Sequence, residues 1–198
     1  MEEVLDDLIE KFWKNERTLE MQQLAGEHGW KFIPRGRFAE QPTALKGFGL
    51  FKGKRGKRIT GLLEPAVSGL GYRSRVYDYI YYGDGGKKKT TVIELQNDQL
   101  DLYPFRIHPK RGLSRLFSRR ESNYVLEADD VYQAGIQIPE SAWQLIDQHD
   151  KLTLEGEGST LLYYYYKRLI PASSIPDEQS MAVEIAEKIL LDRENEYV

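Results

Sequence analysis

The sequence predicts an α+β fold in which a mainly antiparallel, meandering sheet is flanked by an N-terminal helix, a short internal helix and a C-terminal helix. Strand-like segments follow one another through tight turns instead of alternating with crossover helices, and amphipathic helical patterns occur at both ends of the chain. The 198 residues are expected to form a single domain. Its parts are the N-terminal helix over 1–28, the sheet core over 30–170 and the C-terminal helix over 177–195.

The first part of the chain combines a helix with two strands. Apolar residues recur at helical spacing over residues 3–25, and Gly26 follows this pattern. The sequence "WKFI" at 30–33 predicts a short strand, and a second strand is expected over 57–67. Between these strands, three apolar side chains are expected to reach the core: Leu45, Phe48 and Leu50.

A β-hairpin is predicted at residues 75–95, "RVYDYIYYGDGGKKKTTVIEL". Residues 76–82 favour a strand, "GDGG" at 83–86 supplies the positive φ angles of a tight turn, and "TTVIEL" at 90–95 returns. Alternation divides the first strand into one face with Val76, Asp78, Ile80 and Tyr82 and another with Arg75, Tyr77, Tyr79 and Tyr81. Because neither face is purely polar, we expect both faces to be partly covered.

The later elements are three strands, a short helix, a second hairpin and a long helix. Strands are expected at 100–109, where Pro104 indicates a bulge or an edge position, and at 123–128 and 134–139. A short helix starts at Pro139, and "GEGS" marks the turn of the second hairpin. The last helix is expected to bury a stripe formed by Ala182, Ile185, Ala186 and Ile189.

Composition favours a cytoplasmic protein without a transmembrane segment. Cysteine is absent, which excludes disulfides and thiolate metal sites and suits a reducing compartment. The start of the chain, "MEEVLDDLIE", is acidic and amphipathic, unlike a signal peptide. No uninterrupted apolar run approaches the about 18 residues typical of a membrane-spanning helix.

The charges are divided unevenly along the chain. Residues 51–120 contain 16 lysines and arginines against 6 acidic residues, a charge of +10, whereas residues 121–198 carry −11 within a total of −3. The two sections could neutralise each other inside the fold. Alternatively, the basic section leaves a face open to an anionic partner.

No motif in the chain identifies a reaction or a cofactor. The histidines His28, His108 and His149 lack the spacing of a metal motif. The glycine-rich segments at 47–58 and 69–74 do not complete a phosphate-binding pattern, and no G-x-S-x-G sequence occurs. We therefore expect a protein that is not an enzyme and that binds neither a cofactor nor a metal.

Asp78 is the carboxylate best placed for chemistry, because it lies between two tyrosines on a predicted strand. Burial beside aromatic rings would raise its pKa. A pocket around Asp78 and the tyrosines would suit a small hydrolase or ligand-binding enzyme. The alternative to a catalytic role is a structural one, in which Asp78 accepts a hydrogen bond from a neighbouring tyrosine hydroxyl.

Aromatic and basic residues together form the candidate binding surface. Single-stranded nucleic-acid binders combine stacking rings with cationic grooves. The hairpin offers the first group of candidates, Arg75, Tyr77, Tyr79, Tyr81, Lys87, Lys88 and Lys89. The basic segment at 110–121, "KRGLSRLFSRRE", adds a stripe of Arg111, Arg115 and Arg119 at helical spacing.

Five segments resemble an uncharacterised bacterial family: "LAGEHGWKF" at 24–32, "LFKGKRGKRITGLLEP" at 50–65, "VYDYIYY" at 76–82, "TTVIEL" at 90–95 and "LYPFRIHPK" at 102–110. That family has a Leu-Ala…Gly-Trp opening, a Phe/Tyr-Asp-Tyr-x-Tyr strand, a threonine-valine return strand and a Pro…Phe…Pro segment. Val76 and the stretch at 111–135 depart from its pattern. The resemblance implies a stand-alone bacterial domain and transfers no activity or catalytic residue.

The sequence therefore favours a non-catalytic binding or accessory module that uses a basic central surface. A small hydrolase or ligand-binding enzyme and a single-stranded nucleic-acid binder are the alternatives. Pairing of an uncovered sheet edge would also allow a homodimer.

Overall fold

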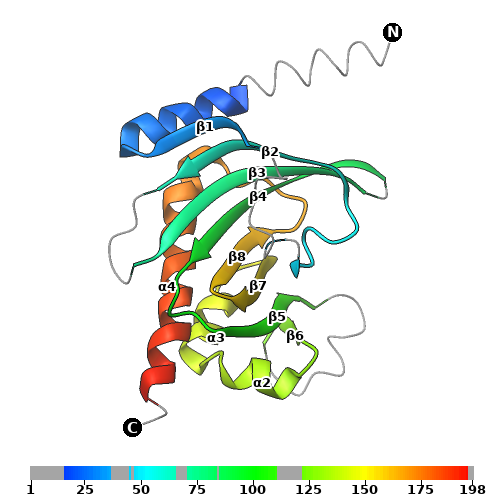
Figure 1. Ribbon diagram of the computed structural model, residues 1–198, viewed down its shortest axis with the longest axis vertical. Coiled ribbons are helices and arrows are strands. Elements are labelled where there is room, and N and C mark those ends of the chain that lie inside the picture. The colour runs from blue at the N-terminus through cyan, green and yellow to red at the C-terminus, as the bar shows by residue number, and fades with distance from the viewer. Residues whose placement is uncertain are drawn as a thin grey trace.

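The computed structural model describes residues 16–36, 45, 47–65, 71–83, 85–110 and 122–195, with side chains described to residue 191. Within these ranges, eight strands form one sheet in which all neighbouring strands are antiparallel (Figure 1). The strands are β1 (Lys31–Gly36), β2 (Arg55–Glu64), β3 (Arg73–Gly83), β4 (Gly86–Gln96), β5 (Leu102–Pro109), β6 (Tyr124–Glu127), β7 (Leu152–Gly158) and β8 (Thr160–Tyr165).

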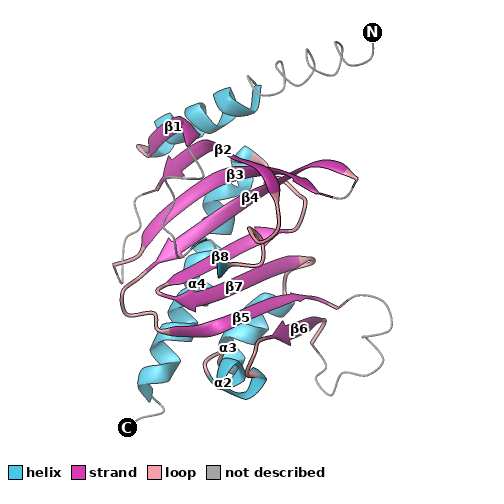
Figure 2. Cartoon of the chain, turned by 45° about the vertical axis from the view of Figure 1, so that its right-hand side comes forward, coloured by secondary structure: helices cyan, strands magenta, loops and turns pink. Residues whose placement is uncertain are grey.

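The helices cover one face of the sheet, which we call the helix face (Figure 2). They are the N-terminal helix, described over 16–28, α2 (Val131–Ile136), α3 (Glu140–Asp147), the 3-10 helix η4 (Ala172–Ser174) and α4 (Ile175–Asn195). The predicted stripe of α4 is confirmed, since each of its members is 0% exposed: Ala182, Ile185, Ala186 and Ile189. This stripe packs into one core with Val76 of β3 and Ile93 of β4.

The opposite face is covered by Leu45 and residues 47–54, and we call it the loop face. The apolar residues predicted to reach the core are buried there together with Phe51, namely Leu45, Phe48 and Leu50. They form a second core with Tyr77, Tyr79 and Tyr81 of β3. The β3–β4 hairpin is thus covered on both faces, as its mixed alternation predicted.

Both predicted hairpins are confirmed, whereas one predicted strand is wrong. The pairing of β5 with β7 shifts register between Leu102 and Phe105, which is the bulge expected near Pro104. The residues expected to begin a strand at 134 belong instead to α2. The carboxylate of Asp130 accepts hydrogen bonds from the backbone N–H groups of Tyr132 and Gln133 at 3.0 and 3.1 Å, and this N-cap favours a helix.

Strands that are consecutive in the sequence pair with each other within β1–β4, β5–β6 and β7–β8, and only the order of these three groups departs from a simple meander. The strand order is β1-β2-β3-β4-β8-β7-β5-β6, so the β7–β8 hairpin lies between β4 and β5. The predicted N-terminal helical residues before 16 and the basic segment at 111–121 lie outside the described residues. In the part of the chain that is described, no helix is long and apolar enough to span a membrane.

Candidate functional site

The three tyrosines of the predicted binding surface lie in the interior. Tyr77, Tyr79 and Tyr81 are 0%, 0% and 1% exposed. The ring of Tyr79 packs edge-on against Phe51, with 4.8 Å between the centroids, and stacks on Tyr81 at 5.1 Å. Because protein covers these rings, they offer no stacking surface to a single-stranded nucleic acid.

Arg75 binds a buried carboxylate of the neighbouring strand. Its guanidinium donates to Glu94, and the Tyr77 hydroxyl donates to the other carboxylate oxygen at 3.0 Å. Burial raises the pKa of Glu94, and Arg75 opposes this increase because it stabilises the charged form. The Arg75 side chain is therefore engaged in the sheet.

Asp78 lies on the helix face, on the opposite side of β3 from the three tyrosines. It is 2% exposed, and it accepts hydrogen bonds from Arg17 Nε at 2.9 Å and from Thr91 Oγ1 at 2.6 Å. The expected bond from a tyrosine hydroxyl is therefore wrong, since the donors are an arginine of the N-terminal helix and a threonine of β4. The sheet separates Asp78 from the tyrosines, so they do not line a common pocket.

The glycine-rich segment at 47–58 binds a carboxylate of the protein itself. The backbone N–H of Leu50 donates to Glu155 Oε1 at 3.0 Å, and the N–H of Gly49 and the hydroxyl of Tyr164 donate to the same carboxylate. A Cβ at Gly49 would lie 3.2 Å from Glu155 Oε2, so glycine allows the close approach. Adjacent backbone amides favour an anion, and Glu155 supplies it.

The histidines also have neighbours within the fold. His108 Nε2 lies 2.9 Å from a Glu127 carboxylate oxygen, His149 Nδ1 lies 3.2 Å from the Tyr165 hydroxyl, and the His28 ring packs on Trp30. Within the described ranges, no group of three or more histidine or carboxylate side chains could hold a metal ion.

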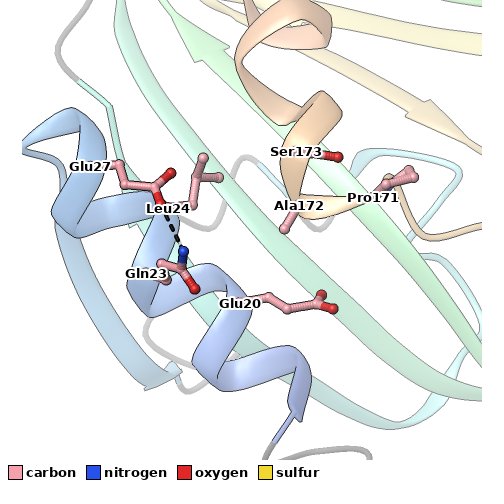
Figure 3. A pocket seen from close by; sticks show the side chains of 7 residues that line it. All are labelled: Glu20, Gln23, Leu24, Glu27, Pro171, Ala172 and Ser173. Carbon is pink, nitrogen blue, oxygen red and sulfur yellow. Dashed lines mark hydrogen bonds between the residues drawn. The ribbon is translucent and has the colours of Figure 1, made fainter.

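A groove of about 330 Å³ separates the N-terminal helix from the turn that precedes α4 (Figure 3). Its lining residues are Glu20, Gln23, Leu24, Glu27, Pro171, Ala172 and Ser173. The Gln23 amide donates to Glu27 at 2.8 Å, and Glu20 pairs with Arg17 at 3.3 Å. The polar side chains on the helix side of the groove thus pair within the N-terminal helix itself, and we assign the groove no ligand.

Four cationic side chains share the helix face at the end of β2, β3 and β4 next to the β3–β4 turn. Two rows of paired residues cross these three strands. The row nearer the turn is formed by Arg55, Tyr82 and Lys87, and the next row by Arg58, Ile80 and Lys89. Residues directly opposite on neighbouring strands share a face. Both arginines are exposed, both lysines are partly exposed, and Tyr82 is 46% exposed. We call Arg55, Arg58, Tyr82, Lys87 and Lys89 the cationic corner.

A β-bulge at Gly56 places the two arginines on the same face. Arg55 and Arg58 are three positions apart, but they pair with Tyr82 and Ile80, which are only two apart, so β2 contains one extra residue. Gly56 adopts a φ of 57°, in the left-handed region that favours glycine. Its missing side chain also leaves space for an aromatic ring, because a Cβ there would lie 2.7 Å from Tyr82 Cδ2.

Replacing Gly56 with alanine is expected to lower the free energy of unfolding by about 1–2 kcal/mol, because alanine is strained in the left-handed region and its Cβ would displace the Tyr82 ring. Gly26→Ala is the matched control, since Gly26 is helical and a Cβ added there would meet no atom of the described residues within 4 Å. There the expected change is a gain of about 0.5–1 kcal/mol. Urea unfolding followed by circular dichroism measures both, and equal effects would contradict the role given to Gly56.

The structure brings some of the predicted binding residues to the cationic corner and separates others. Lys87 and Lys89 belong to the corner, whereas Lys88 lies on the loop face opposite Tyr81 and donates to the Gly85 carbonyl at 3.0 Å. The predicted candidates outside the described residues are Arg111, Arg115 and Arg119. Sequence reasoning missed Arg55, Arg58 and Tyr82, although "KRGKR" at 54–58 covers the start of the strand that pairs with the hairpin.

The sequence matches no protein-family model and no curated protein, which agrees with the resemblance to an uncharacterised family. Among solved structures, the chain is similar to the crystal structure of the mycobacterial trehalose monomycolate transport factor A, TtfA. The TM-score is 0.59 with 11% sequence identity, and the alignment covers 87% of this chain and 93% of the TtfA chain in that structure. At this identity the similarity shows a shared fold.

Proposed function

We propose that this protein is a non-catalytic binding module that attaches to the anionic surface of a larger, cytoplasmic partner through the cationic corner. The observation that carries the proposal is the bulge at Gly56, which places Arg55 and Arg58 on one face of β2, beside the exposed Tyr82 of β3 and on the same face as Lys87 and Lys89 of β4. A bulge that reorients side chains at the end of a sheet is typical of functional sites.

The geometry of the corner suits two or more neighbouring anionic groups. Its cations lie on β2 and β4, the outer two of three adjacent strands, about 10 Å apart, and in two rows that are about 7 Å apart along the strands. Arginine forms paired hydrogen bonds with carboxylates or phosphates, and lysine adds a point charge. The exposed Tyr82 ring between them can pack on an apolar or aromatic group. An acidic protein surface offers both kinds of contact.

The structural neighbour supports an accessory role of a general kind. TtfA is described as a transport factor, and a binding module that assists a larger process fits such a description. The interior of this chain supports the same interpretation, because the buried carboxylates Asp78, Glu94 and Glu155 bind arginine, tyrosine, threonine or backbone groups of the protein.

Reversing two charges of the corner is expected to weaken binding to a polyanion by about tenfold or more, which corresponds to about 1.4 kcal/mol. The variant is Arg55→Glu/Arg58→Glu, and the probes are heparin and poly-glutamate. The wild-type protein should be retained on heparin despite its net charge of −3, and the variant should elute early. In a plot of the logarithm of the heparin-binding constant against the logarithm of the salt concentration, the slope of the variant should be smaller in magnitude by about one for each lost contact.

The matched control reverses two exposed cations elsewhere on the sheet, Lys31→Glu/Arg73→Glu, whose side chains are 65% and 73% exposed. It has the same net charge as the corner variant and should retain more of the wild-type affinity. Equal loss in both variants would show that net charge alone controls binding and would overturn the proposal. Preferential binding of single-stranded DNA over poly-glutamate would favour nucleic acid as the partner.

A further inference from the structure

The short helix α2 has apolar side chains on both sides. Ala134 is fully buried against the sheet, whereas Val131, Tyr132 and Ile136 are 54%, 74% and 51% exposed. Tyr132 and Ile136 are four positions apart and therefore lie on one face of the helix. A contiguous exposed surface of large apolar side chains typically marks an interaction site.

A fourth exposed apolar residue comes from β5. Tyr103 is 37% exposed, and its backbone is tied to the end of α2 by the Gln137 side chain. The Gln137 amide donates to the Tyr103 carbonyl and accepts from the Tyr103 N–H, both at 2.9 Å, and Gln137 itself is 4% exposed. Strand and helix are thereby held together. We call Tyr103, Val131, Tyr132 and Ile136 the α2 patch.

The chain segment that carries α2 is acidic. The stretch from 122 to 150 contains no lysine or arginine and six acidic residues. Two of these residues, Asp129 and Asp130, directly precede α2, and Asp130 is its N-cap. Both are exposed. Glu140, at the start of α3, is also exposed. A partner that covers the apolar side chains would place its own flanking charges beside these carboxylates, which favours positive ones.

We infer that the α2 patch is a docking surface for a cationic amphipathic segment of a partner protein. Such a segment would lay its apolar side chains on Tyr132 and Ile136, and its lysines or arginines would meet Asp129 and Asp130. The patch lies on β5 and α2, whereas the cationic corner lies on the far strands β2, β3 and β4 (Figure 1). The two surfaces have opposite charge, so they select different partners, and the inference does not depend on the function proposed for the corner.

The test measures binding of a fluorescein-labelled peptide, KLLKLLKKLLKLLK, to the full-length protein by fluorescence anisotropy. Tyr132→Ser/Ile136→Ser is expected to weaken binding at least tenfold. The control Leu19→Ser/Leu191→Ser removes two exposed leucines elsewhere, which are 63% and 42% exposed, and should stay within twofold of wild type. The peptide ELLELLEELLELLE, in which glutamate replaces lysine, should bind at least tenfold more weakly than the cationic peptide.

Three outcomes would overturn the inference. Equal affinities of the patch and control variants would show that the peptide binds elsewhere, and equal binding of the two peptides would remove the charge argument. A dimer in sedimentation velocity that Tyr132→Ser/Ile136→Ser abolishes would make a second copy of the chain the occupant. Because the substituted side chains are exposed, stability should change by only a few tenths of a kcal/mol, and circular dichroism verifies that both variants are folded.

Discussion

Replacing Arg17 with methionine is expected to destabilise the protein by about 3–5 kcal/mol, the usual cost of leaving a buried charge without its partner. Arg17 is 7% exposed, and its guanidinium donates to both oxygens of Asp78 at 2.9 and 3.3 Å. It also donates to the Ile170 carbonyl at 2.7 Å. One side chain thus connects the N-terminal helix, β3 and the segment before α4. Its loss leaves the Asp78 carboxylate buried without its charge partner.

Urea unfolding of Arg17→Met measures this effect, and Lys31→Met is the control. Lys31 and Glu64 form an ion pair at 2.7 Å with side chains 65% and 37% exposed, and such surface pairs contribute at most about 1 kcal/mol. In Arg17→Met/Asp78→Leu the unpaired Asp78 carboxylate is removed as well, so much of the lost stability should return. An Arg17→Met variant as stable as Lys31→Met would show that Asp78 obtains its stabilisation from other groups.

Much of the fold could be predicted from the sequence, because its elements depend on patterns within a few residues. The buried stripe of α4, the β3–β4 hairpin and the apolar residues at 45, 48 and 50 all follow from local spacing. The strand expected at 134–139 failed for a local reason as well. The Asp130 cap starts a helix whose exposed side carries apolar side chains, so the usual alternation of polar and apolar residues is lost.

The candidate site could be predicted only in part, because it depends on pairing between distant residues. Arg17 and Asp78 are 61 positions apart, and no periodicity links them. Regular alternation would place Arg55 and Arg58 on opposite faces of a strand, and only the extra residue at Gly56 brings them together. Lys87 and Lys89 were found because the hairpin that contains them is local. The tyrosines were misplaced because a distant segment, residues 47–54 with Leu45, covers the loop face.

The protein is expected to unfold cooperatively above pH 10, because many of its tyrosines are buried. Burial raises the pKa of Tyr124 and of Tyr72 to about 12, and it raises the pKa of Tyr77 and Tyr164 well above the ordinary value of 10. Each such hydroxyl stays protonated in the folded state while it ionises in the unfolded chain. The stability that this provides below pH 10 is therefore lost as the pH rises toward the raised pKa, by up to about 1.4 kcal/mol per pH unit for each tyrosine.

Several buried tyrosines acting together would exhaust a total stability of about 5–15 kcal/mol, so ionisation at 295 nm should coincide with loss of the far-ultraviolet circular dichroism signal. Tyr72→Phe isolates one contribution, because the Tyr72 hydroxyl is buried and has no hydrogen-bond partner among the described residues. The variant should match or exceed wild-type stability at pH 7 and gain about 1 kcal/mol more over wild type by pH 11. Gradual ionisation of all tyrosines in a protein that stays folded would contradict the packing of both cores, since it would require water to reach the rings that the helices and residues 47–54 cover.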